Sequence, residues 1–183
     1  MLIEERKFVF PNGEEAIIRS ARSEDAPLLK DLRETTAAET HFLAREPEDG
    51  PFNLERMKGF LDSFEASKTD FMINAFLGDQ IVGDLGVFMV RPHLKYMHRG
   101  YLGMSIRQKY TGMGLGSYMM SLAIEQAKHN GFEQLELGVY SDNEIARHLY
   151  EKSGFKEYGI NPRAFKLLDG TYRDEIIMVN IFE

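Results

Sequence analysis

Three glycines stand at alternate positions in a segment that joins an expected strand to an expected helix. Gly112, Gly114 and Gly116 lie within residues 108–117, and the strand is expected over residues 98–106. Glycine has no Cβ, so successive backbone N–H groups can converge on one point. The N-terminus of the following helix adds about half a positive charge. The segment can therefore cradle a phosphate or pyrophosphate, although a plain tight turn would use the same glycines.

Two familiar phosphate motifs do not fit this segment. A P-loop ends in Gly-Lys-Ser or Gly-Lys-Thr, whereas here Gly116 is followed directly by Ser117. A dinucleotide fingerprint spaces its glycines as Gly-x-Gly-x-x-Gly and opens a βαβ unit, whereas this chain has one residue between each pair of glycines and places them after several strands. Both motifs are therefore disfavoured.

Apolar periodicity and turn residues divide the rest of the chain into short elements. The 183 residues suit one domain, residues 1–183. The order of elements is ββ, αα, βββ, α, β, α, ββ, which indicates a mixed α/β or α+β fold. Strands are expected over residues 7–10, 15–19, 71–77, 80–90, 98–106, 135–139, 157–168 and 171–182. Helices are expected from a Ser23 cap to about Ala38, over 54–67, from the glycine segment to Asn130-Gly131, and over 143–153.

Composition excludes several classes of protein. The net charge is −7, which argues against a nucleic-acid partner because phosphates need a basic face. Cysteine is absent, so disulfides, thiolate metal sites and cysteine nucleophiles are excluded. No metal-ligand cluster stands out among the five histidines, and no apolar stretch of about 18 residues or signal-like start is found. We expect a cytoplasmic protein with no metal and no membrane partner.

The glycine segment also resembles a known family motif. Thr111-Gly112-Met113-Gly114-Leu115-Gly116 is similar to Arg/Gln-x-x-Gly-x-Gly/Ala, motif A of the GCN5-related N-acetyltransferases (GNAT), with Thr111 as a departure. The segment from Asn143 to Phe155 resembles motif B, and residues 18–26 resemble the opening of the family. The resemblance covers roughly the whole chain. It implies a central mixed, mostly antiparallel sheet of about seven strands flanked by about four helices.

The resemblance implies acetyl-CoA as the acyl donor. In the family, a strand edge pairs with the pantetheine arm, the loop N–H groups hold the pyrophosphate, and an asparagine contacts the cofactor. Asn143 would equally serve as the cap of the following helix. The cofactor-binding residues implied in this way are Met104, Ser105, Ile106, Thr111, Gly112, Met113, Gly114, Leu115, Gly116, Ser117 and Asn143.

The resemblance places Tyr150 at the position of the general acid. A phenol with a pKa of ~10 can protonate a thiolate whose conjugate acid lies near ~8.5, if the two are aligned. Helical spacing alone would make Tyr150 a core aromatic residue on the face it shares with Ala146.

A base for the acceptor amine is harder to identify, since an aliphatic amine with a pKa of ~10.4 must first lose a proton. One subgroup of the family, which acts on ribosomal-protein N-termini, has a glutamate five residues before the asparagine, where this chain has Gly138. Strand alternation predicts that Asp84 points outward, with a role in binding a substrate cation as the alternative. A relay through water needs no dedicated base. The candidates elsewhere are Glu39 and His41, which the resemblance would place at the acceptor site, then Glu46, Asp84, His98 and Glu136. For each of them an ordinary solvated or capping role is the alternative.

These observations predict an N-acetyltransferase that moves an acetyl group from acetyl-CoA to a primary amine of a small molecule or peptide. The alternative is a CoA-binding sensing or regulatory protein with little turnover. A larger acyl donor is a third alternative, since no residue defines the acyl pocket. A homodimer through the C-terminal strands rests on family habit alone.

Overall fold

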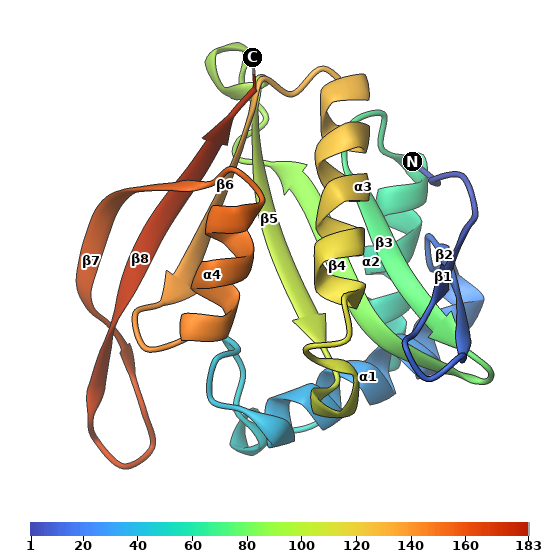
Figure 1. Cartoon of the computed structure of the whole chain (residues 1–183), viewed down its shortest axis with the longest axis horizontal. Coiled ribbons are helices and arrows are strands. Elements are labelled where there is room, and N and C mark those ends of the chain that lie inside the picture. The colour runs from blue at the N-terminus through green and yellow to red at the C-terminus, as the bar shows by residue number, and fades with distance from the viewer. Residues whose placement is uncertain (183) are drawn as a thin grey trace.

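A single sheet forms the centre of the molecule in the computed structural model, which describes residues 1–182. Within these residues the sheet has eight strands in the order β1-β2-β3-β4-β5-β6-β8-β7, rather than about seven (Figure 1). All neighbours are antiparallel except β5 and β6. The strands are β1 (Arg6–Val9), β2 (Glu15–Arg19), β3 (Phe71–Leu77), β4 (Gln80–Met89), β5 (Arg99–Ile106), β6 (Gln134–Tyr140), β7 (Lys156–Lys166) and β8 (Tyr172–Ile181).

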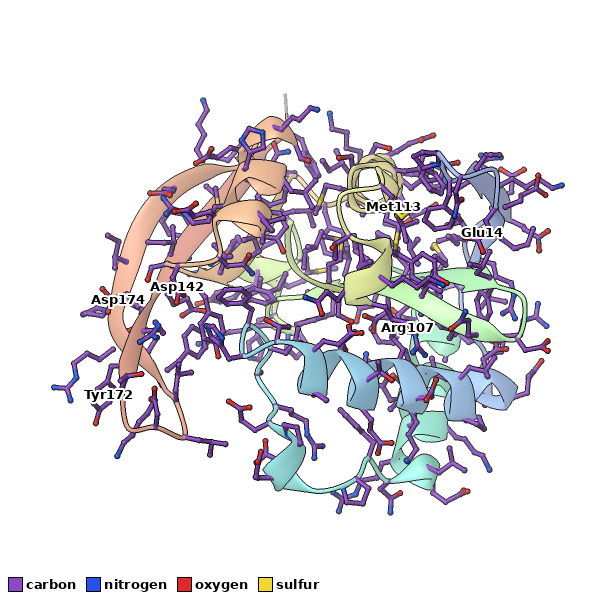
Figure 2. All side chains as sticks on the ribbon, turned by 60° about the horizontal axis from the view of Figure 1, so that its bottom comes forward. Glu14, Arg107, Met113, Asp142, Tyr172 and Asp174 are labelled. Atoms are coloured by element: carbon purple, nitrogen blue, oxygen red, sulfur yellow. The ribbon has the colours of Figure 1, made fainter. Side chains whose placement is uncertain are left out.

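Four α-helices of the described residues cover the two faces of the sheet. They are α1 (Ala26–Glu39), α2 (Leu54–Ala66), α3 (Leu115–His129) and α4 (Glu144–Lys152). Figure 2 shows α1 and α2 on one side of the sheet and α3 and α4 on the other. Each face has its own apolar core, as expected for a layered mixed domain. None of the helices in residues 1–182 is long and apolar enough to span a membrane.

The apolar period of α3 explains how it packs. Leu115, Met119, Ala123 and Ala127 recur at intervals of four residues and are fully buried. The last turn runs into Gly131, whose φ of +86° continues the chain past the helix end in a left-handed conformation. Helix α3 is therefore fixed along its length against the sheet, and its N-terminus is fixed next to β5.

Two local predictions are wrong. Ser23 does not cap the first helix, because it lies inside a 3-10 turn, Ser23–Asp25, and Asp25 is the N-cap residue of α1. Asp84 does not point to solvent, because its side chain is buried with 6% of the residue exposed and accepts hydrogen bonds from Arg33 at 3.2 Å. Asp25 and Asp84 are each paired with an arginine, Arg19 and Arg33 respectively.

The parallel contact between β5 and β6 positions the candidate site. The two strands pair only at their starts, from Arg99↔Gln134 to Tyr101↔Glu136. Figure 1 shows them running in the same direction and moving apart towards their C-terminal ends. Residues 102–106 of β5 are thus unpaired on the side facing β6. We call the region between residues 102–106 and 137–140 the β5–β6 splay.

Candidate functional site

The edge of β5 that faces the splay carries free backbone groups. In the β4–β5 ladder, the N–H of Arg107 donates to the carbonyl oxygen of Val82 at 3.0 Å. Alternation along an antiparallel ladder then turns the backbone groups of Ser105 to β4 and those of Met104 and Ile106 to the splay. Two of the three residues predicted to meet an extended ligand therefore offer an N–H and a carbonyl oxygen there.

The side chains of these strand residues hold the edge in place. Ile106 and Met104 pack into the core between β5 and α3, and a Cβ on Gly116 would lie 3.3 Å from Ile106 Cδ1. Ser105 donates its hydroxyl hydrogen to Asp84 at 2.5 Å. Because Asp84 also accepts from Arg33, this carboxylate is already neutralised and fixes β5 instead of facing a substrate cation.

The three glycines at the junction of β5 and α3 have different physical roles, since Gly116 already lies in the first turn of the helix. Gly112 and Gly114 have φ values of +72° and +89°, which residues other than glycine rarely adopt. Gly116 has an ordinary φ, but a Cβ there would lie 3.2 Å from Leu149 Cδ2 of α4. The first two glycines shape the loop, and the third allows α3 and α4 to approach each other beside the splay.

The loop presents backbone N–H groups without partners. Within residues 1–182, no hydrogen bond is made by the N–H groups of residues 112–117. The start of the segment is fixed by Glu39, whose carboxylate accepts from the N–H of Gln108 at 2.7 Å. Thr111, the departure from the motif, turns its hydroxyl back to the carbonyl oxygen of Gln108 at 2.8 Å. Free N–H groups at a helix N-terminus fit a pyrophosphate.

The ends of this loop are visible in Figure 2, where Arg107 and Met113 mark the segment that joins β5 to α3. Arg107 donates to the carbonyl oxygen of Ile81 at 2.9 Å and pairs with Asp31 of α1. The chain therefore leaves β5 at a fixed point, and the open strand edge leads directly into the loop.

Tyr150 lies on the α4 side of the splay. The residue is 7% exposed and its ring packs in the core near Phe155, with ring centroids 6.0 Å apart. Its hydroxyl makes no hydrogen bond with any other residue in 1–182. Burial, and secondarily the neighbouring Tyr101, raises the pKa of Tyr150 to about 12. The phenol is therefore a core aromatic with an unused, protonated hydroxyl.

Asn143 caps helix α4. Its side-chain oxygen accepts from the N–H of Ala146 at 3.2 Å, which is the helix-capping role that its sequence position allows. The amide group also retains its two N–H donors, for which the described residues supply no partner. A contact between Asn143 and a cofactor stays a prediction.

The loop after α1 closes over the other side of β6. His41 Nε2 lies 3.5 Å from an Asp142 carboxylate oxygen, and its ring packs against Phe42 with centroids 4.2 Å apart. Tyr140 stacks on Phe165 of β7 at 3.8 Å and donates its hydroxyl hydrogen to the backbone of this loop. His41 thus contributes to an aromatic wall beside β6, whereas Glu39 is engaged in the glycine loop.

The three remaining base candidates lie on different parts of the chain, and of these Glu136 is paired with an arginine. Glu136 is 5% exposed and forms a two-pronged pair with Arg99, whose hydrogen bonds hold the pKa of this carboxyl below its usual value. The backbone N–H of Glu46 donates to Asp49 in a surface turn. His98 lies just before β5, where its carbonyl oxygen accepts from Glu133.

Two polar side chains at the splay escaped the sequence analysis. Tyr101 of β5 accepts a hydrogen bond from the backbone N–H of Gly138 at 3.1 Å. The carboxylate of Glu175 on β8 lies directly over Gly138. A glycine inside a strand signals a close approach by another group, and Gly138 is such a signal, but it does not say which residue approaches.

Comparison with known proteins agrees with this architecture. The family model described as "Acetyltransferase (GNAT) family" matches residues 30–155. The chain belongs to this family. An acetyltransferase of the GNAT family from Streptococcus pneumoniae superposes with a TM-score of 0.86 at 28% identity, covering 91% of this chain and 99% of that one.

Two further proteins extend the comparison. A GNAT superfamily phosphinothricin acetyltransferase from Sinorhizobium meliloti, in complex with acetyl-CoA, has the same fold with a TM-score of 0.80 at 15% identity, covering 91% of this chain and 88% of that one. N-alpha-acetyltransferase 30 of Schizosaccharomyces pombe is 33% identical over 61 residues, which cover 33% of this chain and 41% of that protein. The chain spans less than half the length of the curated relatives that it matches.

Proposed function

We propose that this protein is an acetyl-CoA-dependent N-acetyltransferase that acetylates a primary amine of a small molecule or peptide. The observation that carries the proposal is the continuity of free backbone groups. The splay-facing edge of β5, at Met104 and Ile106, leads into the unpartnered N–H groups of residues 112–117. An extended pantetheine arm followed by a pyrophosphate needs this sequence of groups.

The same residues fit the chemistry of acyl transfer. An N–H of β5 in the splay would polarise the thioester carbonyl, and one such donor contributes roughly 3–4 kcal/mol to an oxyanion transition state. Tyr150 would donate a proton to the leaving sulfur, since its high pKa keeps the phenol protonated at neutral pH. The acetyl-CoA complex of the Sinorhizobium meliloti neighbour supports the choice of donor.

The acceptor is expected on the face of the sheet that carries α1 and α2. The aromatic wall of His41, Phe42, Tyr140 and Phe165 lies there beside β6. His41 would border the acceptor from this wall. Glu39 would support the donor loop rather than the acceptor, because its carboxylate is already bonded to the N–H of Gln108.

An assay of CoA release over an amine panel tests the proposal. The panel contains an amino acid, a polyamine, an aminosugar and a peptide with a free N-terminus, each with acetyl-CoA as donor. Turnover with at least one amine, together with its acetylated product by mass spectrometry, is the expected result. Tight acetyl-CoA binding with no turnover on any amine would instead support a CoA-binding sensor of the same fold.

A further inference from the structure

The carboxylate of Glu175 occupies the space that a side chain at position 138 would fill. A Cβ built on Gly138 would lie 2.0 Å from Glu175 Oε1. The register explains this contact, since Glu175 of β8 pairs with Tyr140 of β6, and residues 138 and 140 face the same side of the sheet. Gly138 therefore makes room for a carboxylate from the neighbouring strand.

Glu175 belongs to a polar cluster that spans the splay. The N–H of Gly138 donates to the Tyr101 hydroxyl, and the pKa of Tyr101 is raised by burial and then by the charge of Glu175. Tyr101 is in turn the second cause, after burial, of the raised pKa of Tyr150. The cluster thus brings the carboxylate on β8 and the phenol on β5 together around Gly138 of β6.

Glu175 differs from the two buried carboxylates near the site, those of Asp84 and Glu136, in having no cation. Asp84 is paired with Arg33, and Glu136 is paired with Arg99. Within residues 1–182, no lysine, arginine or histidine nitrogen lies within 4.0 Å of the Glu175 carboxylate. Its side-chain partner is Asn161 Nδ2, at a long 3.4 Å. A half-buried carboxylate without a cation is suited to bind an ammonium group.

We infer that Glu175 is the catalytic residue that binds the acceptor ammonium and accepts its first proton. This role rests on the proposed function, in which no general base for the acceptor amine has been assigned. The neutral amine nitrogen then forms a bond to the thioester carbonyl carbon, and the carbon–sulfur bond breaks. Tyr150 gives its proton to the sulfur and regains one from the new amide nitrogen. The net proton released per turnover leaves through Glu175 to water.

The test compares Glu175→Gln with the wild type on the best amine of the panel. Glutamine keeps the size of the side chain and removes the proton acceptor, so kcat/KM is expected to fall roughly 10²–10⁴-fold at pH 7. The variant depends on amine that is already neutral in solution, and this fraction rises about tenfold for each unit by which the pH rises towards the amine pKa of ~10.4. The ratio of wild-type to variant kcat/KM is therefore expected to shrink about tenfold per unit of rising pH. Acetyl-CoA affinity is expected to stay unchanged.

Other groups do not produce this pH signature. The phenols that face Glu175 are Tyr101 of β5 and Tyr140 of β6, and burial raises the pKa of both above the ordinary value. Both phenols stay protonated from pH 6 to 9. His41, Glu46 and Asp142 surround Tyr140 and are retained in both proteins, so any pH dependence that they contribute cancels when the variant is compared with the wild type. The matched control is Glu15→Gln on β2, which removes an exposed carboxylate paired with Lys7 at the far end of the sheet. It is expected to match the wild type at every pH.

A rescue variant separates catalysis from a structural role. Glu175→Ala clears the space over residue 138, and adding Gly138→Glu returns a carboxylate to that space from β6. The double variant is expected to regain at least about tenfold over Glu175→Ala, a recovery typical of a restored proton acceptor. Equal kcat/KM for the wild type and Glu175→Gln at pH 7 would overturn this inference and leave the proposed function standing. A wild type inactive on every amine would overturn both.

Discussion

Replacing Tyr150 by phenylalanine removes one oxygen atom and leaves the packing of α4 intact. The ring is 7% exposed and sits in the core, while the hydroxyl makes no hydrogen bond with any other residue in 1–182. No buried partner is left unsatisfied by the change, so the free energy of unfolding at pH 7 is expected to change by less than about 1 kcal/mol. Because stability should barely change, any loss of activity in Tyr150→Phe can be attributed to the chemical role of the hydroxyl.

The kinetic effect of the same change is expected to be large. Loss of a general acid lowers a rate roughly 10²–10⁴-fold, which corresponds to about 2.7–5.4 kcal/mol of transition-state stabilisation. The loss should appear in kcat and kcat/KM together, because the proton is delivered only as the sulfur leaves. Acetyl-CoA affinity should stay within about threefold of the wild type, since the loop N–H groups and the β5 edge are untouched.

Three measurements on Tyr150→Phe check this reasoning: CoA release under saturating acetyl-CoA, calorimetric titration with acetyl-CoA, and thermal unfolding. The expected pattern is slow turnover with normal binding and a normal melting temperature. Unchanged turnover would remove Tyr150 as the acid. A large fall in melting temperature would show that the hydroxyl has a structural role in the folded chain.

Two further predictions follow from named residues. Gly112→Ala and Gly131→Ala both place a side chain at a positive φ, +72° and +86°, with open space around the Cβ. Each substitution should therefore lower the free energy of unfolding by about 1–2 kcal/mol. Calorimetry should show weaker acetyl-CoA binding for Gly112→Ala and unchanged binding for Gly131→Ala. Equal affinities of the two variants for acetyl-CoA would contradict the assignment of the glycine loop to the donor. The pKa of Tyr150 is about 12 in the folded chain and ~10 unfolded, so the unfolded chain binds fewer protons between these values. Urea unfolding should therefore show about 2–3 kcal/mol of stability lost as the pH rises from 10 to 12, and Tyr150→Phe should lack this part of the loss.

Much of the fold could be predicted because its signals are local. The Gly78-Asp79 and Asp169-Gly170 turns define two hairpins, and the period of apolar residues from Leu115 onward defines α3. The glycine loop could also be predicted, since a run of alternate glycines before a helix is a local pattern. These features depend on residues that are neighbours in the sequence.

The missing part of the site depends on strand order. Glu175 reaches Gly138 because β8 inserts between β6 and β7, and the sequence does not specify that order. Tyr101 meets Gly138 only because β5 and β6 pair for three residues and then diverge. The burial of Asp84 likewise depends on a distant element, since its partner Arg33 comes from α1, 51 residues away in the sequence.

Backbone amide NMR during a titration with acetyl-CoA locates the donor on the protein. We expect the donor along the splay-facing edge of β5 and on the loop, so the largest shifts should fall on the N–H groups of Met104, Ile106 and residues 112–117. Gly131, at the other end of α3, should move little. Large shifts elsewhere, with residues 104–117 unmoved at saturation, would contradict the assignment of this site.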